Sequence, residues 1–333
     1  MLELVEVVKR FEVKTGILSR EKLTAVDKVS FTIKENETVG LVGESGCGKS
    51  TIGKCIVKLI DIEGGQVKFL GKDIASLREK DFRRLRKDIQ MVFQNPLMSF
   101  NPLFTINQSL LDSINLHPEY KYKSRAEKKE RVAELLDMIK LPYDFAEKRP
   151  HEISGGQLQR IGIARALASE PRFVFLDEPT SALDMSIRGQ IVNLLLDLQD
   201  IFKTSYLFIT HDLRVIYFMA DRVLVMYLGQ IVETGSKDMI FHNSLHPYTH
   251  GLLVATLIGQ DKRQEASRIS RLRGELVKQK EGMAGCKLYN RCPYATIKCK
   301  EPQELREVKK EHWVRCWRAE ELQLKTKIFD TII

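Results

Sequence analysis

The chain has 333 residues, of which 43% are hydrophobic and 29% are charged, close to the average for globular proteins. This length predicts one large domain or two ordinary ones, and the composition excludes a disordered chain, a collagen-like chain and a long coiled coil. Lys and Arg outnumber Asp and Glu by 53 to 44, a formal charge of +9, but the two signs are interleaved. The charge therefore predicts a mixed solvated surface, while attraction to nucleic acid, anionic lipid or phosphate ligands stays open.

No segment of the sequence is apolar enough to cross a membrane. The longest apolar runs, residues 173–176 and 223–228, are far shorter than the roughly 18 residues of a spanning helix. The first residues include Glu3 and Glu6 and lack a continuous apolar stretch. We therefore expect no secretory signal and a location in the cytosol.

The first motif follows a short buried strand that is predicted at residues 38–42. Residues 43–50, here called the phosphate loop, read Gly-Glu-Ser-Gly-Cys-Gly-Lys-Ser and match the pattern G-x-x-x-x-G-K-[ST]. Glycines let backbone N–H groups turn inward around phosphate oxygens, and the next helix points its positive end at the same anion. Lys49 supplies a charge for the β- and γ-phosphates, and the Ser50 hydroxyl can bind Mg²⁺. The alternative is a glycine-rich turn without a ligand.

A helix, a strand and a second helix are predicted after the phosphate loop. The helix after the phosphate loop presents one apolar face, formed by Ile52, Cys55, Ile56, Leu59 and Ile60. Gly64 and Gly65 end that element, and residues 67–70 resume as a strand. A further helix is predicted over residues 124–140, with a capping box formed by Ser124 and Glu127. Its buried stripe consists of Val132, Leu135, Leu136 and Ile139.

Residues 154–157 read Ser-Gly-Gly-Gln and precede another helical pattern. Ser154 and Gln157 have capping-box spacing for a helix that continues through Leu167. Gly155 and Gly156 let backbone N–H groups approach an anion at that helix start. A plain helix cap is the alternative, but the segment is too far along the chain to complete the phosphate loop. We therefore interpret it as a phosphate clamp offered to another copy of the chain.

Three continuous apolar runs, residues 173–176, 206–209 and 223–227, are separated by helical patterns. Such runs predict strands of a mostly parallel sheet that is buried on both faces, and therefore an α/β fold. Asp177 and Glu178 end the first run. Ligands bind at this edge of open α/β sheets, so these carboxylates are candidate functional groups.

The acidic pair and a histidine complete the candidate site. An Asp at this point of a P-loop protein holds Mg²⁺, which assigns Asp177 to the metal. Glu178 can orient and polarise an attacking water, although an ordinary acidic strand end is the alternative. His211 follows the next strand and could contact the γ-phosphate or the water, or be structural.

Together these motifs resemble the ATP-binding cassette (ABC) family in type and in order, over roughly residues 1–245. A P-loop GTPase or kinase does not explain residues 154–157. The matches are residues 43–51 to Walker A, Gln94 to the Q-loop, residues 153–157 to the signature with Ile153 for the usual Leu, residues 173–178 to Walker B, residues 181–184 to the D-loop, and His211 to the switch histidine.

This resemblance implies the fold and its division. The fold class would be α/β, a P-loop NTPase of the RecA-like type, with a mostly parallel sheet core and an antiparallel β part. The ATP-binding core would comprise residues 1–94 and 171–245, and a helical subdomain with the signature would occupy residues 95–170. Residues 246–333 would form a small cysteine-rich C-terminal extension.

The resemblance also implies a role for each matching residue. Phe11 would stack on adenine, unless it is an ordinary core aromatic, and Glu178, His211 and Gln94 would be catalytic. Mg²⁺ would be held by Ser50, Gln94 and Asp177. Asp184 would line the interface between two nucleotide sites. ATP would contact Gly43, Ser45, Gly46, Cys47, Gly48, Lys49, Ser50 and Thr51 on one copy, and Ser154, Gly155, Gly156 and Gln157 on the other.

The chain is also similar to the second ATPase subunit of dipeptide and oligopeptide permeases. The similarity rests on residues 246–249 with 252–253, on residues 10–14, on residues 95–96 with 99–102, and on residues 285–286. It implies an ABC importer that takes up peptides or a related solute, with this chain at the cytoplasmic face of the membrane. The partners would be a second ABC ATPase subunit, two integral membrane subunits and an extracellular or periplasmic solute-binding protein, with no nucleic acid. A soluble ABC ATPase acting on nucleic acid or ribosomes is the alternative.

Four of the six cysteines crowd into the last fifth of the chain, at Cys286, Cys292, Cys299 and Cys316. In a cytosolic protein such a group favours metal over disulfides, and the spacing is not that of a zinc ribbon. The residues alone leave zinc, an iron–sulfur cluster and unligated thiols open. The similarity to permease subunits implies a [4Fe–4S] cluster, with a structural role. Residues 260–281 are charged and read as a linker or exposed helix.

Overall fold

The computed structural model describes residues 1–14, 20–181, 183–257, 272 and 285–324. These residues divide into two compact units, which we describe separately. The first unit contains Met1, Ile33–Thr38 and Ser76–Thr210, and the second contains Leu2–Thr32, Val39–Ala75 and the chain from His211 onward. Ala182 of the expected D-loop and nearly all of the expected linker at 260–281 lie outside the described residues.

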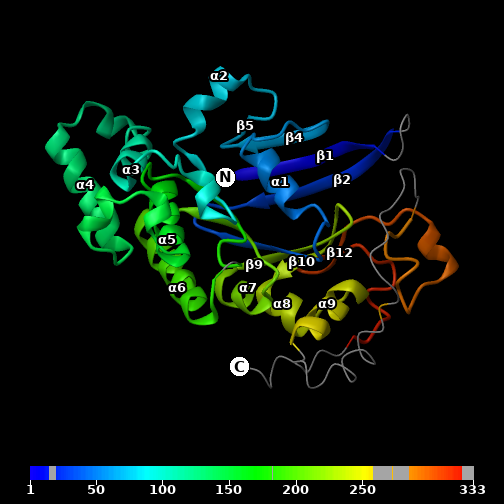
Figure 1. Cartoon of the computed structure of the whole chain (residues 1–333). Helices are drawn as coiled ribbons and strands as arrows, with labels where there is room; N and C mark the ends of the chain where they lie inside the picture. The colour runs from blue at the N-terminus through cyan, green and yellow to red at the C-terminus, as the bar shows by residue number, and fades with distance from the viewer. Residues whose placement is uncertain (15–19, 182, 258–271, 273–284, 325–333) are drawn as a thin grey trace. The chain divides into compact units, whose positions relative to one another are not determined.

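The second unit begins with an antiparallel sheet whose strand order is β2-β1-β4-β5 (Figure 1). Strand β1 pairs antiparallel with β4, and β4 pairs antiparallel with β5. This sheet is the antiparallel part that the family resemblance implied. Its strands are β1 (Leu2–Lys14), β2 (Arg20–Ile33), β4 (Gly64–Phe69) and β5 (Lys72–Asp73).

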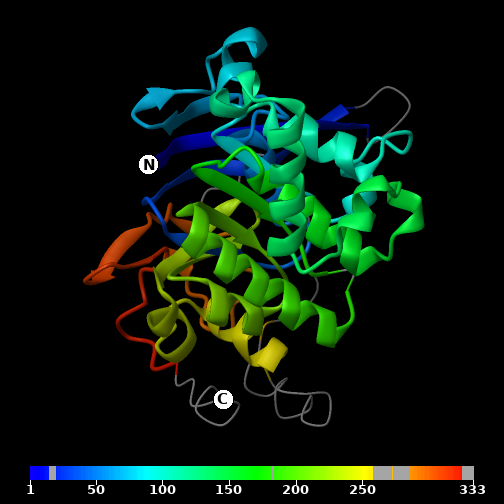
Figure 2. The ribbon, with the colours of Figure 1, turned by 90° about the vertical axis from the view of Figure 1, so that its left-hand side faces the viewer.

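The same unit holds the strand that leads into the phosphate loop. Strand β3 pairs in parallel with β9. Beyond β9 the order is β10, β12 and β11, and each of these strands pairs antiparallel with the one before it. Figure 2 shows the β11–β12 hairpin in orange, within residues 285–324, here called the cysteine-rich segment. The strands are β3 (Thr38–Val42), β9 (Arg222–Tyr227), β10 (Gln230–Ser236), β11 (Arg306–Lys309) and β12 (His312–Val314), and the helices are α1 (Lys49–Ile56), α7 (Leu213–Met219), α8 (Lys237–His242) and α9 (Pro247–Leu257).

The first unit contains three parallel strands and the remaining helices. Strand β7 lies between β6 and β8 and pairs in parallel with both. All five residues of β7 and all five of β8 are buried, as expected for strands covered on both faces. The elements are β6 (Ile89–Val92), β7 (Phe173–Asp177), β8 (Ser205–Ile209), α2 (Glu79–Phe82), α3 (Ile106–Ile114), α4 (Arg125–Met138), α5 (Gly155–Leu167) and α6 (Met185–Phe202).

Local sequence chemistry explains where α4 begins. The Ser124 Oγ accepts the Glu127 N–H at 3.2 Å, and the Glu127 carboxylate accepts the Ser124 N–H at 2.7 Å. This capping box satisfies two donors that a helix start leaves without partners. The four residues of the predicted apolar stripe are all buried, so the prediction for this helix is confirmed.

The predicted apolar face of the helix after the phosphate loop was too long. Helix α1 ends at Ile56, and the Leu59 side chain is 52% exposed. Lys58 adopts a left-handed backbone conformation with φ of 52°, which ends helical geometry before the next turn can form. The Lys58 ammonium then donates to the Ala75 carbonyl at 2.8 Å, which holds the chain in its new direction.

In the described part of the chain, no helix is long and apolar enough to span a bilayer.

Candidate functional site

The phosphate loop connects β3 to α1 in a conformation that requires glycine. Gly48 has a φ of +110°, and a Cβ there would lie 2.1 Å from the Ala25 carbonyl oxygen. At Gly43 a Cβ would lie 2.1 Å from the Met226 carbonyl oxygen. Gly48 is also the N-cap of α1 and offers no side chain to the first N–H groups of the helix. The loop therefore presents backbone donors at a helix start, which is the arrangement that binds phosphate.

Lys49 places a positive charge inside this loop. Its side chain is buried, and its Nζ donates to the carbonyl oxygens of Gly43 at 2.9 Å and Glu44 at 3.0 Å. Ser50 and Thr51 follow in the first turn of α1, both half-buried. The loop thus combines helix-start N–H groups with an ammonium, and both favour an anion.

The remaining loop residues divide into exposed and buried positions. Ser45 and Gly46 are exposed, whereas Cys47 is buried and its carbonyl accepts the Gly229 N–H at 2.9 Å. Burial raises the pKa of the Cys47 thiol, which keeps it protonated near neutral pH. Cys47 therefore serves packing of the loop, and its backbone rather than its sulfur is the group suited to phosphate.

Glu44 is a residue of this loop that the sequence reasoning missed. Its carboxylate forms a two-pronged ion pair with Arg291 at 2.9 and 3.1 Å, and its N–H donates to the Tyr248 hydroxyl at 2.8 Å. Arg291 lies 247 positions further along the chain. No local pattern could have indicated this pair.

In the first unit, Glu178 directly after β7 forms a hydrogen bond with Gln94, the predicted Q-loop residue. The Gln94 Nε2 donates to the Glu178 Oε2 at 3.1 Å. Glu178 has a φ of 46°, an uncommon conformation for a residue other than glycine, and its N–H donates to the Ile209 carbonyl at 2.9 Å. Asp177 is 6% exposed and lies in register with Ile209. The structure thus brings together two of the three expected catalytic residues.

The Ser154 segment forms an exposed helix start. The Ser154 N–H and hydroxyl both donate to the Gln157 Oε1, at 3.3 and 2.8 Å, so the predicted cap is confirmed. Ser154 and Gly155 are exposed, and α5 has no acidic residue in its first turn. Gly156 lies against α6, since a Cβ there would be 3.0 Å from the Ile187 side chain. Figure 1 shows α5 and α6 side by side. This helix start can accept an anion from outside the chain.

The other expected contact residues lie at the surface. Asp184 is the exposed N-cap residue of α6, and His211 is exposed between β8 and α7. The Phe11 side chain on β1 is 38% exposed, and the Lys9 Nζ lies 5.3 Å from its ring centroid. The exposed ring argues against the alternative that Phe11 is an ordinary core residue.

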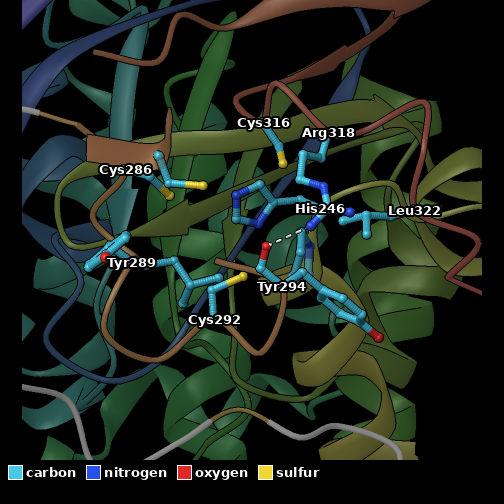
Figure 3. A pocket seen from close by; sticks show the side chains of 11 residues that line it. His246, Cys286, Tyr289, Cys292, Tyr294, Cys316, Arg318 and Leu322 are labelled. Carbon is cyan, nitrogen blue, oxygen red and sulfur yellow. Dashed lines mark hydrogen bonds between the residues drawn. The ribbon is translucent and has the colours of Figure 1, made fainter. Parts of the chain in front are cut away.

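The four clustered cysteines line one cavity in the second unit (Figure 3). Figure 3 shows the sulfur atoms of Cys286, Cys292 and Cys316 directed toward the same space. Each of these sulfurs accepts a hydrogen bond from the backbone N–H two residues later in the chain. Cys299 accepts hydrogen bonds from the Trp317 Nε1 at 3.3 Å and the Thr296 N–H at 3.5 Å. All six cysteines are described, and none forms a disulfide.

The pKa of the Cys299 thiol is shifted in the opposite direction from those of the other three cysteines. Burial raises the pKa of Cys286, Cys292 and Cys316 to about 11 each. Burial acts in the same sense on Cys299, but its hydrogen bonds from Thr296 and Trp317 outweigh it and lower the pKa of this thiol. Cys299 is therefore the cysteine that most readily becomes a thiolate.

The arrangement does not match the ligands of a single metal ion. Among the residues that the structure describes, no three His, Cys, Asp or Glu side chains converge to hold such an ion. A zinc ion binds its thiolates at about 2.3 Å, which brings their sulfurs close together. A [4Fe–4S] cluster binds one thiolate on each iron and holds the sulfurs further apart. Among the described residues the structure therefore confirms neither a zinc site nor the expected cluster.

Comparisons with known proteins find two regions of the chain that match known families. Residues 26–181 match the family described as ABC transporter, and residues 232–299 match the oligopeptide/dipeptide transporter, C-terminal region. The oligopeptide transport ATP-binding protein AppF of Bacillus subtilis (strain 168) is 44% identical over 320 residues, covering 95% of this chain and 96% of AppF. The oligopeptide transport ATP-binding protein OppF of Escherichia coli (strain K12) is 42% identical over 327 residues, covering 97% of each chain.

Solved structures show the same similarity. The ATP-binding cassette MJ0796, as a dimer in a post-hydrolysis state bound to ADP and Pi, matches with a TM-score of 0.64 and 32% identity. The match covers 71% of this chain and 99% of that one.

Proposed function

The chain belongs to the ABC transporter ATP-binding proteins of the oligopeptide and dipeptide group, and from this premise we propose how it works. It is the ATPase subunit of a peptide importer, and it hydrolyses ATP to drive uptake through separate membrane subunits. The observation that carries this function is the phosphate loop. Its glycines leave no room for a Cβ at Gly43 or Gly48, and Lys49 is buried inside it.

ATP binding follows from the groups that the loop presents. The N–H groups at the start of α1 and the Lys49 ammonium take the β- and γ-phosphates, while Phe11 stacks on adenine. The exposed Phe11 ring supports this assignment. Ser50, Asp177 and Gln94 would hold Mg²⁺, which neutralises charge on the phosphate oxygens when it is bound. The oxygen ligands that these residues offer suit that ion.

Glu178 is the general base for ATP hydrolysis, and Gln94 and His211 assist it. A carboxylate can accept a proton from the attacking water and orient it toward phosphorus. The Gln94 amide donates to one oxygen of Glu178 at 3.1 Å, which supports a positioned carboxylate. The uncommon backbone conformation of Glu178 supports the same role, because such strain persists where surrounding structure holds a functional residue in place.

Two cassettes act together in a head-to-tail dimer. The exposed start of α5, with Ser154, Gly155, Gly156 and Gln157, clamps the γ-phosphate of ATP that the partner holds, and Asp184 lines the shared interface. The γ-phosphate is present only before hydrolysis, so ATP favours closure and ADP does not. This difference in affinity can drive a conformational cycle.

The chain works within a larger assembly. We place residues 95–170 as the helical subdomain that receives two membrane subunits, between core segments 1–94 and 171–245 and the extension 246–333. Exposed apolar side chains at Leu97 and Met98 support a contact surface there. A different ABC ATPase is the second cassette, a solute-binding protein outside the membrane delivers the peptide, and the chain lies at the cytoplasmic face.

Glu178→Gln tests the assigned base. We expect ATP hydrolysis by the complex that copurifies with this chain to fall about 100-fold or more, while ATP-dependent closure of the two cassettes persists. Lys49→Met is the matched contrast, because it should abolish ATP binding and therefore closure as well. Hydrolysis by Glu178→Gln at the parental rate would show that another group is the base.

Copurification tests transport against action on nucleic acid. Extraction in mild detergent should yield two integral membrane subunits with this chain, and a peptide should stimulate ATP turnover. Tight, salt-sensitive binding to DNA or RNA without membrane partners would instead favour the soluble alternative.

We propose that the four cysteines bind a [4Fe–4S] cluster, as the similarity to permease subunits implies. Such clusters use one cysteine sulfur per iron and hydrogen bonds to the sulfurs, and each of these four sulfurs accepts a hydrogen bond from a backbone N–H. A bound cluster would cross-link the loops of the cysteine-rich segment, whose apolar core is small. Anaerobically purified protein should then show broad visible absorbance and contain iron. Protein that lacks both, while its ATPase is intact, would leave the cysteines as unligated thiols.

A further inference from the structure

Glu44, the second residue of the phosphate loop, forms hydrogen bonds through its backbone N–H, its carbonyl and its carboxylate. The Glu44 N–H donates to the Tyr248 hydroxyl at 2.8 Å, and its carbonyl accepts Lys49 Nζ at 3.0 Å. Its carboxylate pairs with both Nη atoms of Arg291, at 2.9 and 3.1 Å. Two of these three partners come from the chain beyond residue 246, outside the ATP-binding core expected from the sequence.

Arg291 is itself fixed in position. Its Nη1 also lies 3.3 Å from the Tyr227 hydroxyl, and the Tyr227 ring packs on that of Tyr248 with centroids 4.5 Å apart. The Arg291 N–H donates to the Leu288 carbonyl at 2.8 Å, within the turn that leads to Cys292. The two side chains of the ion pair are 13% and 25% exposed, so water screens the pair only in part.

A carboxylate in a phosphate loop has an electrostatic cost. Glu44 brings negative charge close to the loop that receives a triphosphate, and like charges repel most strongly where water is scarce. A guanidinium stays charged at all relevant pH values, and its planar fork fixes both carboxylate oxygens at once. Arg291 can therefore both neutralise Glu44 and set the orientation of the backbone that follows it.

We propose that Arg291 is a positioning residue for ATP binding, through which the cysteine-rich segment braces the phosphate loop at Glu44. This inference rests on the proposed function, because it takes the loop as the site of ATP. It has a consequence for the segment as a whole. Disruption of the turn between Cys286 and Cys292 releases the guanidinium, and ATP affinity falls although no residue of the phosphate loop has changed.

The test is nucleotide affinity in the full chain. Arg291→Met retains most of the side-chain volume and removes the charge, and we expect ATP to bind about tenfold more weakly. In the transport complex the KM for ATP should rise by a similar factor, with kcat little changed. Arg291→Lys should fall between the two, because an ammonium keeps the charge without the fork. This variant also carries the test if Arg291→Met does not fold.

The double variant separates bracing from general destabilisation. Glu44→Gln combined with Arg291→Met removes the unpaired carboxylate, so ATP affinity should recover relative to Arg291→Met alone. The matched control is Arg306→Met, which breaks an Arg306–Glu320 pair of the same 2.9 Å length within the cysteine-rich segment. It should leave ATP affinity unchanged.

The outcomes distinguish the two proposals. If the parental chain does not bind ATP, the proposed function fails and the brace fails with it. If the parental chain binds ATP and Arg291→Met binds it equally well, the brace alone is wrong. The brace is also wrong if the double variant is no better than Arg291→Met, or if Arg306→Met weakens ATP binding equally.

Discussion

Glu233 is the residue whose replacement should most directly loosen the cysteine-rich segment. It is completely buried in β10, and its carboxylate accepts the N–H groups of Leu245 at 2.7 Å and His246 at 3.0 Å. The His312 Nε2 of β12 lies 2.8 Å from the same carboxylate. One side chain thus ties together β10, the residues before α9 and the C-terminal hairpin.

Glu233→Leu keeps an apolar side chain of similar length but leaves these three buried groups without an acceptor. Each buried group that loses its partner costs about 1–3 kcal/mol. Three such groups together cost at least about 3 kcal/mol, and we expect about 4 kcal/mol here. For a unit of this size that corresponds to a fall in Tm of about 8–16 °C.

Urea unfolding followed by tryptophan fluorescence measures this loss of stability in the cysteine-rich segment. The chain has only two tryptophans, Trp313 and Trp317, and both lie in the cysteine-rich segment. Thr234→Val is the control, because the buried Thr234 hydroxyl has no hydrogen-bond partner in the structure, and its loss should leave stability unchanged or slightly raised. A Glu233→Leu variant within about 1 kcal/mol of the parental chain would refute the reasoning, because three unsatisfied groups cannot cost so little.

Three further predictions concern other parts of the molecule. Gly48→Ala should reduce ATP affinity by about tenfold or more in equilibrium titrations, because its Cβ would lie 2.1 Å from a carbonyl oxygen. Arg131→Met should lower the urea-derived free energy of unfolding by about 1–3 kcal/mol, because the largely buried guanidinium loses two glutamate partners at 2.8 and 2.9 Å. Burial lowers the pKa of His250 below its ordinary 6.5. As the pH decreases below 6.5, the imidazole therefore takes up a proton in the unfolded chain before it does so in the folded chain. The free energy of unfolding then decreases as the pH decreases. His250→Leu should reduce the slope of unfolding free energy against pH below 6.5, while the part due to His246, whose pKa burial lowers to about 4, should remain.

Much of the secondary structure could be predicted because its causes are local. Strand β3 lies at the predicted residues, and α5 runs from the predicted cap at Ser154 through Leu167. Capping boxes and apolar periodicity depend on residues three or four positions apart, so the sequence displays them directly. The error at Leu59 has a different origin. The spacing there was helical, but the left-handed conformation of Lys58 and its bond to Ala75 diverted the chain.

The sequence by itself determined the residue types of the candidate site and their order along the chain. From these the family resemblance, the phosphate loop and the acidic end of β7 could all be predicted. Only the tertiary structure decided that Gln94 donates to Glu178, 84 positions away, and that four cysteines surround one cavity. It alone paired Glu44 with Arg291. Such contacts depend on how strands are ordered and where the chain returns, and neither periodicity nor spacing encodes that path.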